Sequence, residues 1–438
     1  MATAPSTSMV ALKETLLDWA WPPAVNLARK TVLSIFSGLE KGDLLIVEDA
    51  RGMKHYFGQN TAVNDDNIVR NVYNIPSVRI LVRRDSFWLR LFLFADMGFA
   101  EGYMLGDFEC NDLTSFFRLF IMNRDRLNDG MTVFSAISSM VSRLGRSTNT
   151  LSNSLLNTAA HYDISNDMFA AFLSRDMTYS CPIWQDLHNS RDTPEDLEDA
   201  QQTKLLRFIE VKRTGCRVTS VTLSPNQKEL AEERIKGAGL EHRIEVIFMD
   251  YREVPIRAKP YDKIVSIEMI EAVGEDHLAE YFASVHRLLK QDGGIAMFQC
   301  ITIPEAQHAA DAKKRDRFIS QYIFPGGYLP STMQLLEHIN TQSKGTLTLE
   351  NIENIGGHYT KTLRLWREKF LLNFDSKIKL ALLEGHPEMS DESVEVFRRK
   401  WEYYFAYCEA GFVTKTLGDV IITVGRAGTL ELMDGIPL

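Results

Sequence analysis

The stretch Tyr261–Gly274, YDKIVSIEMIEAVG, constrains the fold more than any other part of the sequence. Its β-branched run at 264–267 predicts a short strand that is buried on both faces of a parallel sheet. Glu268 and Glu271 follow directly. In an open α/β sheet the ligand lies beyond the carboxyl ends of the strands, so these carboxylates are placed to meet a substrate. Acids also favour the start of a helix, so a purely structural role stays open.

Length and charge limit the classes of protein that fit. A chain of 438 residues is long for one domain and predicts two or three. Its hydrophobic fraction of 45% and charged fraction of 24% are typical of a globular protein. A net charge of −9 argues against a general nucleic-acid binder, because no excess of cations is present to neutralise phosphates.

Cysteine use and hydropathy indicate a cytoplasmic protein. The five cysteines are widely spaced and form no CxxC pair, which favours reduced thiols over a disulfide framework or a metal site. No apolar run follows a basic segment at the N-terminus, so secretion is not expected. The most apolar stretch, 87–100, is interrupted by Arg90 and Asp96. We therefore expect no transmembrane segment and at most a peripheral association with a membrane.

Four regions follow one another along the chain. A weakly determined leader precedes a small α+β domain, and a linker rich in serine, threonine and asparagine separates that domain from a larger α/β domain. The expected bounds are 1–25 for the leader, 26–128 for the α+β domain, 129–158 for the linker and 159–430 for the α/β domain.

The α+β domain shows both helical and strand periodicity. An amphipathic helix is expected from Asn26, and two strands around a turn at 49–52. Residues 77–83 alternate apolar and cationic side chains, which predicts a strand with one solvated face. Residues 87–123 combine helical spacing with many aromatic side chains, which we expect to form the core.

The larger domain alternates strands with helices, a pattern that predicts a mostly parallel sheet. Helices are expected at 166–173, in the acid-led segment 192–212, after the capping residue Ser224, and before Leu289. Strands are expected at 216–224, 242–249, 261–267, 293–303, 346–355 and 418–428.

A turn at 177–184 interrupts the first of these helices. Pro182 disfavours an α conformation for the residue before it, so Tyr179, Ser180 and Cys181 fall in an irregular turn whose backbone amides can bind a ligand. Cys181 also fits the role of a small buried hydrophobic residue.

Nine ordered motifs resemble those of the cyclopropane-fatty-acyl-phospholipid synthase family, from about Asn26 to Gly425. They are HYDISNDMF, YSCPIW, AQQTK, VTLSPNQ, DYR, IEMIEAVG, YIFPGGYLPS, GGHYTKTLRLW and YCEAGF. The resemblance implies a class I methyltransferase fold with a Rossmann-like sheet. It also implies transfer of a methylene from S-adenosylmethionine to a cis double bond of a phospholipid acyl chain. A sister branch methylates sphingolipids, but YSCPIW and IFPGGYLPS are more similar to the cyclopropane branch.

The resemblance also implies which residues hold the cofactor. Three pairs of residues match positions for its amino-acid end, its ribose and its adenine, and they are, in that order, Tyr179 and Ser180, Thr222 and Gln227, and Asp250 and Tyr251.

A second set of residues matches the family's site for a bicarbonate ion, which acts as the base. Glu271, the Cys181 backbone, Ile301 and Tyr359 belong to this set. Gln299 stands where bacterial members have histidine, and its amide keeps the ability to bind an oxyanion without a positive charge. Bicarbonate would remove a proton from the new methyl group, and the Tyr359 ring would stabilise the carbocation.

One departure from the family is large. Members of the family have a strand that ends in a glycine-rich loop between AQQTK and VTLS. Here Gly215 is the only glycine between Asp163 and Gly237. We therefore expect the first central strand, its loop and most of the following helix to be missing, and cofactor binding to be weak or absent. A segment lost from the gene product explains this more simply than an adapted loop, because the flanking motifs remain.

Two other functions stay open for such a chain. One is a catalytically silent lipid-binding or dimerising homologue, and a homodimer is compatible with either role. The other is a methyltransferase of another lipid, such as a sphingolipid or a sterol. Lys313, Lys314, Arg315 and Arg317 precede the apolar segment YIFPGGYLP and could dock on anionic headgroups, although a solvated helix face is the slightly favoured interpretation.

Overall fold

The computed structural model describes most of the chain, in six stretches. They are residues 22–58, 75–127, 165–185, 194–208, 215–311 and 318–433. The predicted linker 129–158, nearly all of the predicted leader 1–25 and the basic cluster at 313–317 lie outside the described residues.

The chain forms two compact units, and each is discontinuous in sequence. The first unit combines residues up to 171 with 316–325 and 366–414, and the second combines 172–315, 326–365 and 415–438. These units differ from the consecutive domains expected at 26–128 and 159–430, because late helices pack with the N-terminal elements.

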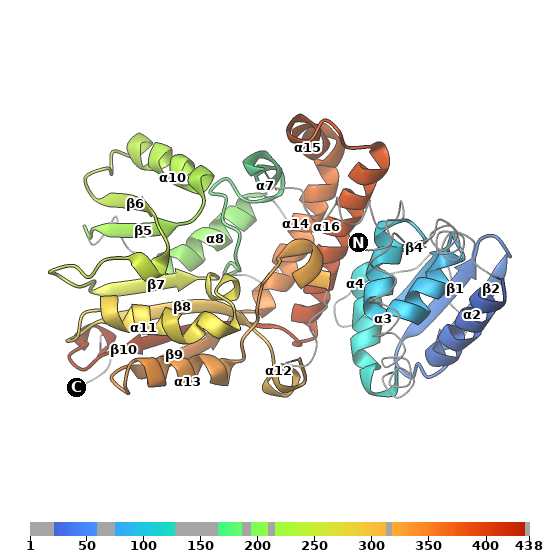
Figure 1. The fold of residues 1–438 in the computed structure, drawn as a ribbon, viewed down its shortest axis with the longest axis horizontal. Helices are drawn as coiled ribbons and strands as arrows, with labels where there is room; N and C mark the ends of the chain where they lie inside the picture. Colours follow the sequence, from blue (N-terminus) through green and yellow to red (C-terminus); the bar gives the residue numbers. More distant parts are fainter. Residues whose placement is uncertain are drawn as a thin grey trace, which may run out of the picture. The chain divides into compact units, whose positions relative to one another are not determined.

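The first unit contains a four-stranded sheet with the order β2-β1-β3-β4 (Figure 1). The hairpin around 49–52 and the alternating burial of β3 confirm two predictions, whereas β4 was not predicted. Phe99 stacks on Phe116 with ring centroids 4.2 Å apart, as expected for an aromatic core. Its elements are α2 (Pro22–Phe36), β1 (Asp43–Glu48), β2 (Met53–Gly58), β3 (Ser77–Val82), α3 (Ser86–Met104), β4 (Phe108–Cys110), α4 (Leu113–Met122), η4 (Ile319–Ile323), η5 (Phe374–Ile378), α15 (Lys379–Gly385) and α16 (Asp391–Val413).

The second unit holds all the predicted site residues. The predicted helices and strands are confirmed within a few residues, and Ser224 caps α10 as expected through a bond from the Gln227 amide. Its elements are α8 (Pro194–Phe208), β5 (Val218–Thr222), α10 (Pro225–Gly237), β6 (Ile244–Phe248), η1 (Tyr251–Glu253), β7 (Lys263–Ile267), η2 (Ile270–Ala272), η3 (Glu275–His277), α11 (Leu278–Leu288), β8 (Ile295–Thr302), α12 (Glu305–Asp311), α13 (Thr332–Gln342), β9 (Thr348–Asn354), β10 (Gly418–Gly425) and η6 (Leu430–Met433). Two helices cross the boundary between the units, α7 (Asn166–Phe172) and α14 (Gly357–Leu372).

The sheet of the second unit is split in two. β7, β8, β10 and β9 form a four-stranded sheet in this order, and β5 and β6 form a separate pair (Figure 1). β5–β6 and β7–β8 are parallel, but β10 is antiparallel to both of its neighbours, so the sheet is less parallel than predicted. Among the described residues no strand joins β5 to β7. This is the position where the missing central strand was expected.

The predicted burial of β7 is wrong. The strand was expected to be buried on both faces, but of its five residues only Ser266 is buried and Lys263 is exposed. β8 is its only hydrogen-bonded neighbour in the described structure, so β7 is an edge strand.

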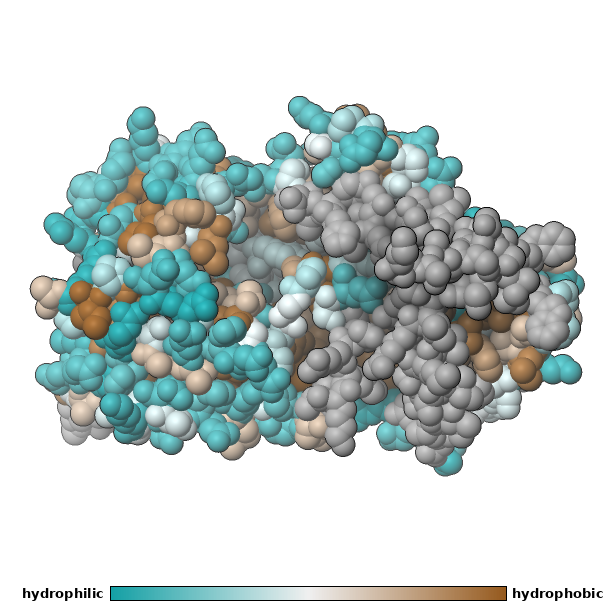
Figure 2. All heavy atoms as spheres, in the orientation of Figure 1, coloured by the Kyte–Doolittle hydropathy of each residue, from teal (hydrophilic) through white to brown (hydrophobic). Residues whose placement is uncertain are grey.

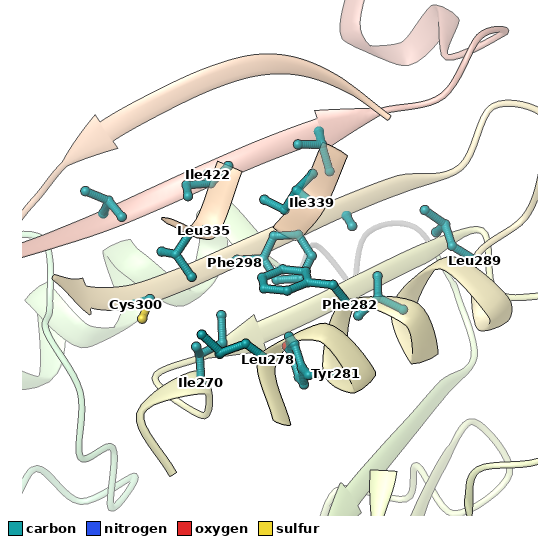
Figure 3. Packing of buried hydrophobic residues seen from close by; sticks show 14 residues of the cluster. Ile270, Leu278, Tyr281, Phe282, Leu289, Phe298, Cys300, Leu335, Ile339 and Ile422 are labelled. Atoms are coloured by element: carbon teal, nitrogen blue, oxygen red, sulfur yellow. The ribbon is translucent and has the colours of Figure 1, made fainter. Parts of the chain in front are cut away.

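The core of the second unit lies against the four-stranded sheet. α11 and α13 pack their apolar side chains on β8 and β10, and Phe282 meets Phe298 with ring centroids 5.3 Å apart (Figure 3). Burial of such side chains contributes roughly 1.5–3 kcal/mol each. This half of the sheet is therefore well supported.

The β5–β6 pair has little core. α10 packs mainly on this pair and has no buried residue. Leu223 and Phe248 are 66% and 53% exposed. Figure 2 shows apolar groups at the surface on the side of the molecule where β5, β6 and β7 lie. In the part of the chain that is described, no helix has the length and apolar run needed to cross a bilayer.

Candidate active site

The site lies at the carboxyl ends of the parallel strands. Thr222 ends β5, and Asp250 lies two residues beyond β6. Glu268 directly follows β7, and Glu271 lies in the short helix η2. Within each parallel pair, β5–β6 and β7–β8, the carboxyl ends lie at one edge, although the two pairs belong to separate sheets.

Three polar groups converge on Glu268. Its Oε1 accepts a hydrogen bond from the Cys181 backbone N–H at 2.7 Å and one from Gln299 Nε2 at 2.8 Å. Its Oε2 accepts one from the Tyr359 hydroxyl at 2.5 Å. Three donors, from the 177–184 turn, β8 and α14, therefore hold one carboxylate. The sequence predicted that these donors would meet, but around an anion oriented by Glu271.

The backbone of Glu268 is strained. Its φ of 46° lies in the left-handed region, where a side chain other than glycine costs on the order of 1–3 kcal/mol. The Glu268 N–H still donates to the Gln299 carbonyl at 2.9 Å, so β7 turns sharply while paired with β8. This turn directs the carboxylate to its donors.

Asp419, at the start of β10, forms the second part of the acid cluster. Gln299 Nε2 also donates to Asp419 Oδ2 at 2.9 Å, so one amide links two carboxyl groups. Burial raises the pKa of Asp419, and the nearby Glu268 carboxylate raises it further. Burial likewise raises the pKa of Glu268. Because the two groups resist ionising together, the pair holds a proton more readily than isolated carboxyls do.

Glu271 lies beside this pair. Its Oε1 accepts a hydrogen bond from the Ile301 backbone N–H at 2.6 Å, which brings together two predicted residues. Its Oε2 is buried and has no hydrogen-bond partner among the described residues. Burial raises the pKa of Glu271 to about 8, and the Glu268 charge contributes. Such a carboxyl exchanges a proton near neutral pH.

Lys204 supplies a positive charge. This fully buried lysine of α8 donates to the Ser180 hydroxyl, and Gln201 Nε2 donates to the Ser180 carbonyl at 2.9 Å. Burial lowers the pKa of Lys204, and the Glu268 carboxylate opposes that shift. These bonds fix the turn that presents the Cys181 N–H.

The residues predicted for the ribose and adenine are not joined to this cluster. The Thr222 hydroxyl donates to Gln227 Oε1 at 2.7 Å, and Arg252 binds both oxygens of Asp250. Tyr251 meets the ring of Tyr281 at 5.4 Å. None of these four predicted side chains has a hydrogen bond to Glu268 or Ser180 in the described structure. Tyr179 makes an edge contact with Phe172.

Sequence reasoning did not assign roles to Lys204 or Asp419, and it placed a bicarbonate ion, oriented by Glu271, where the Glu268 carboxylate lies. Lys204 belongs to the AQQTK motif, and Asp419 is a polar residue at the start of a buried strand. Both features can be recognised in the sequence. The left-handed turn at Glu268 leaves no pattern in the sequence.

Comparison with known sequences supports the predicted family. The profile described as mycolic acid cyclopropane synthetase matches the chain in two segments, residues 149–213 and 206–421. These segments overlap at 206–213, from the end of α8 towards β5, and the missing strand was predicted in this part of the chain. Tuberculostearic acid methyltransferase of Mycobacterium tuberculosis is 35% identical over 355 residues, which are 75% of this chain and 79% of the relative.

Two further comparisons agree. Cyclopropane-fatty-acyl-phospholipid synthase of Escherichia coli is 29% identical over 368 residues, covering 76% of this chain and 84% of the relative. A structure of coclaurine N-methyltransferase bound to N-methylheliamine and SAH resembles the chain with a TM-score of 0.50 and 19% identity, over 76% of this chain and 99% of the other. This likeness confirms the predicted fold class.

Proposed function

The chain belongs to the mycolic acid cyclopropane synthetase family, and on this premise we propose that its acid cluster serves one-carbon transfer to a cis double bond of a phospholipid acyl chain. By family it is an S-adenosylmethionine-dependent methyltransferase. The observation that carries the proposal is the convergence of Cys181, Gln299 and Tyr359 on the Glu268 carboxylate beyond a sheet edge.

The cofactor would supply an electrophilic methyl group when bound. The residues present do not fit it fully. Lys204 and Ser180 form an ordered polar turn, but Thr222, Gln227 and Asp250 are engaged with each other or with Arg252 on the detached β5–β6 pair. No glycine-rich loop is found in the described residues between α8 and β5. We therefore propose that the chain as it stands binds S-adenosylmethionine weakly or not at all.

Bicarbonate does not fit the structure as a separate ion. Three of the groups predicted to hold it already bind Glu268. Added bicarbonate would have to displace this carboxylate and lie near Asp419 and Glu271, where like charges repel. We derive no step through this ion.

The chain's own residues can move a proton. Transfer of a methyl group to an alkene leaves a carbocation, from which a base must take a proton. Glu268 keeps part of its surface accessible and is held by three donors. The buried Tyr359 hydroxyl orients one carboxylate oxygen.

The lipid product tests the proposal. A restored chain, which carries the strand and glycine loop of a close relative between Phe208 and Val218, would be produced in bacteria that lack such an activity. We expect fatty acids one methylene heavier and containing a ring, detected by gas chromatography with mass spectrometry. Absence of any one-carbon product from the restored chain would contradict the proposal.

Two alternatives have specific support. The methyltransferase named for tuberculostearic acid is 35% identical, which favours a methyl-branched product, and the same lipid analysis would separate a branch from a ring. The split sheet favours a second alternative, a catalytically silent lipid-binding homologue.

This role would be supported if the present chain and the restored chain both bind lipid and neither gives a product. Membrane association and a homodimer stay predictions.

A further inference from the structure

Glu268 presents a carboxylate where an anion was predicted. The Cys181 N–H, the Gln299 amide and the Tyr359 hydroxyl come from three separate elements and meet on its two oxygens. The resemblance assigned the same three groups to a bicarbonate ion. A carboxylate and bicarbonate share a planar O–C–O unit, so one set of donors suits either.

We propose that Glu268 is itself the general base of this site and takes the place of a bound anion. This inference rests on the proposed function, because it concerns the base for that reaction. Glu268 would accept a proton from the methyl group on the cationic acyl chain. The electrons of that C–H bond would form the new C–C bond of the ring, and Glu268 would become a neutral acid.

The charge around Glu268 favours an attached base over a second anion. Asp419 of β10 and Glu271 of η2 already face it, and Lys204 of α8 is the cation that acts on it. Tyr359, Cys181 and Cys300 are further titratable groups that act on Glu268. An added bicarbonate would bring one more negative charge into a partly desolvated site, whereas Glu268 is present in every molecule and needs no binding equilibrium.

Asp419 can share the proton that Glu268 accepts from the substrate. Gln299 Nε2 donates to both Glu268 and Asp419, and the buried Asp419 Oδ1 has no hydrogen-bond partner in the part of the chain that is described. The pair can therefore keep a proton while Glu268 is regenerated. Gln299 acts here as a positioning residue, because it touches the base and not the substrate.

Binding of ¹³C-labelled bicarbonate tests the inference without cofactor or turnover. The present chain should not bind the ion, whereas Glu268→Gly should bind it, because glycine frees the three donors and accepts the left-handed backbone. Glu253→Gln, which removes an exposed carboxylate of η1, is the matched control and should behave like the parent. Bicarbonate binding by the parent at the same donors would overturn the inference, as would failure of a folded Glu268→Gly to bind it. Thermal unfolding would establish that the variant folds.

Activity of the restored chain gives a second, separate test. Removal of carbon dioxide should leave its rate unchanged, and Glu268→Gln should lower it by about 10²–10⁴-fold. Added bicarbonate should rescue Glu268→Gly but not Glu268→Gln, whose amide still fills the site. A rate that falls on removal of carbon dioxide would overturn the inference. A restored chain without product would refute the proposed function, while the binding experiment would still decide the role of Glu268.

Discussion

Two helices of the second unit have similar lengths but different surroundings. α11 has 11 residues and buries five of them against the four-stranded sheet, whereas α10 has 13 residues and buries none. Each follows a strand of a parallel pair. The two helices pack on sheets of different size. β7 and β8 belong to a sheet that continues into β10, whereas β5 and β6 form a separate pair. A helix of this fold is stabilised by a continuous sheet more than by its own sequence.

The largest difference in the free energy of unfolding should be seen when one aromatic side chain is removed from the four-stranded sheet and another from the β5–β6 pair. Phe298→Ala, in the core of the four-stranded sheet, should lower the free energy of unfolding by about 3–5 kcal/mol. Phe248→Ala on β6, which is 53% exposed, should lower it by less than about 1 kcal/mol. Urea denaturation followed by circular dichroism would measure both. Equal losses would show that β5 and β6 share the main core.

A smaller effect, on the pH dependence of the free energy of unfolding, should distinguish the acid cluster from the exposed carboxylates. The pKa of Glu271 is raised to about 8, so the folded chain binds this proton more tightly than the unfolded chain does. Its contribution to stability is therefore present at acidic pH and is lost as pH rises towards about 8. The slope would be at most about 1.4 kcal/mol per pH unit for one group.

Denaturation between pH 5 and pH 8 would test this slope. Glu271→Gln should flatten it, although Glu268 and Asp419 retain their own part. The exposed Glu253→Gln should leave the slope unchanged. An identical pH dependence in the parent and in Glu271→Gln would refute the raised pKa.

The smallest effects should come from the helix caps. Ser331 caps α13 in the supported half, and Ser224 caps α10 in the detached pair. Ser331→Ala should lower the free energy of global unfolding by about 1 kcal/mol. Ser224→Ala should have little effect on it but should speed amide exchange within α10, because that helix is expected to open locally. Matching global losses in the two variants would indicate that α10 unfolds together with the core.

The sequence predicted most local elements, because their signals are local. The cap at Ser224 and the hairpin around 49–52 are confirmed. The shortage of glycine before Gly237 predicted a missing central strand, and among the described residues no strand joins β5 to β7. The exposure of β7 could not be read from its β-branched residues, since it depends on whether a neighbouring strand is present.

The acid cluster shows a second limit of the sequence. Lys204, Glu268 and Asp419 are separated by long stretches of chain, and only the fold brings them together. The choice between Glu268 and Glu271 as the central carboxylate depends on a left-handed backbone at Glu268, for which its residue type gives no warning. Cys181, Gln299 and Tyr359 were predicted as partners because their motifs carried them.

Titration of S-adenosylmethionine by calorimetry, into the present chain and into the restored chain, tests most directly whether the split sheet prevents cofactor binding. We expect binding by the restored chain and weak or no binding by the present one, because the missing strand would join β5 to β7 and supply the backbone for the cofactor. Equal, tight binding by both chains would contradict this, and so would equally poor binding by both.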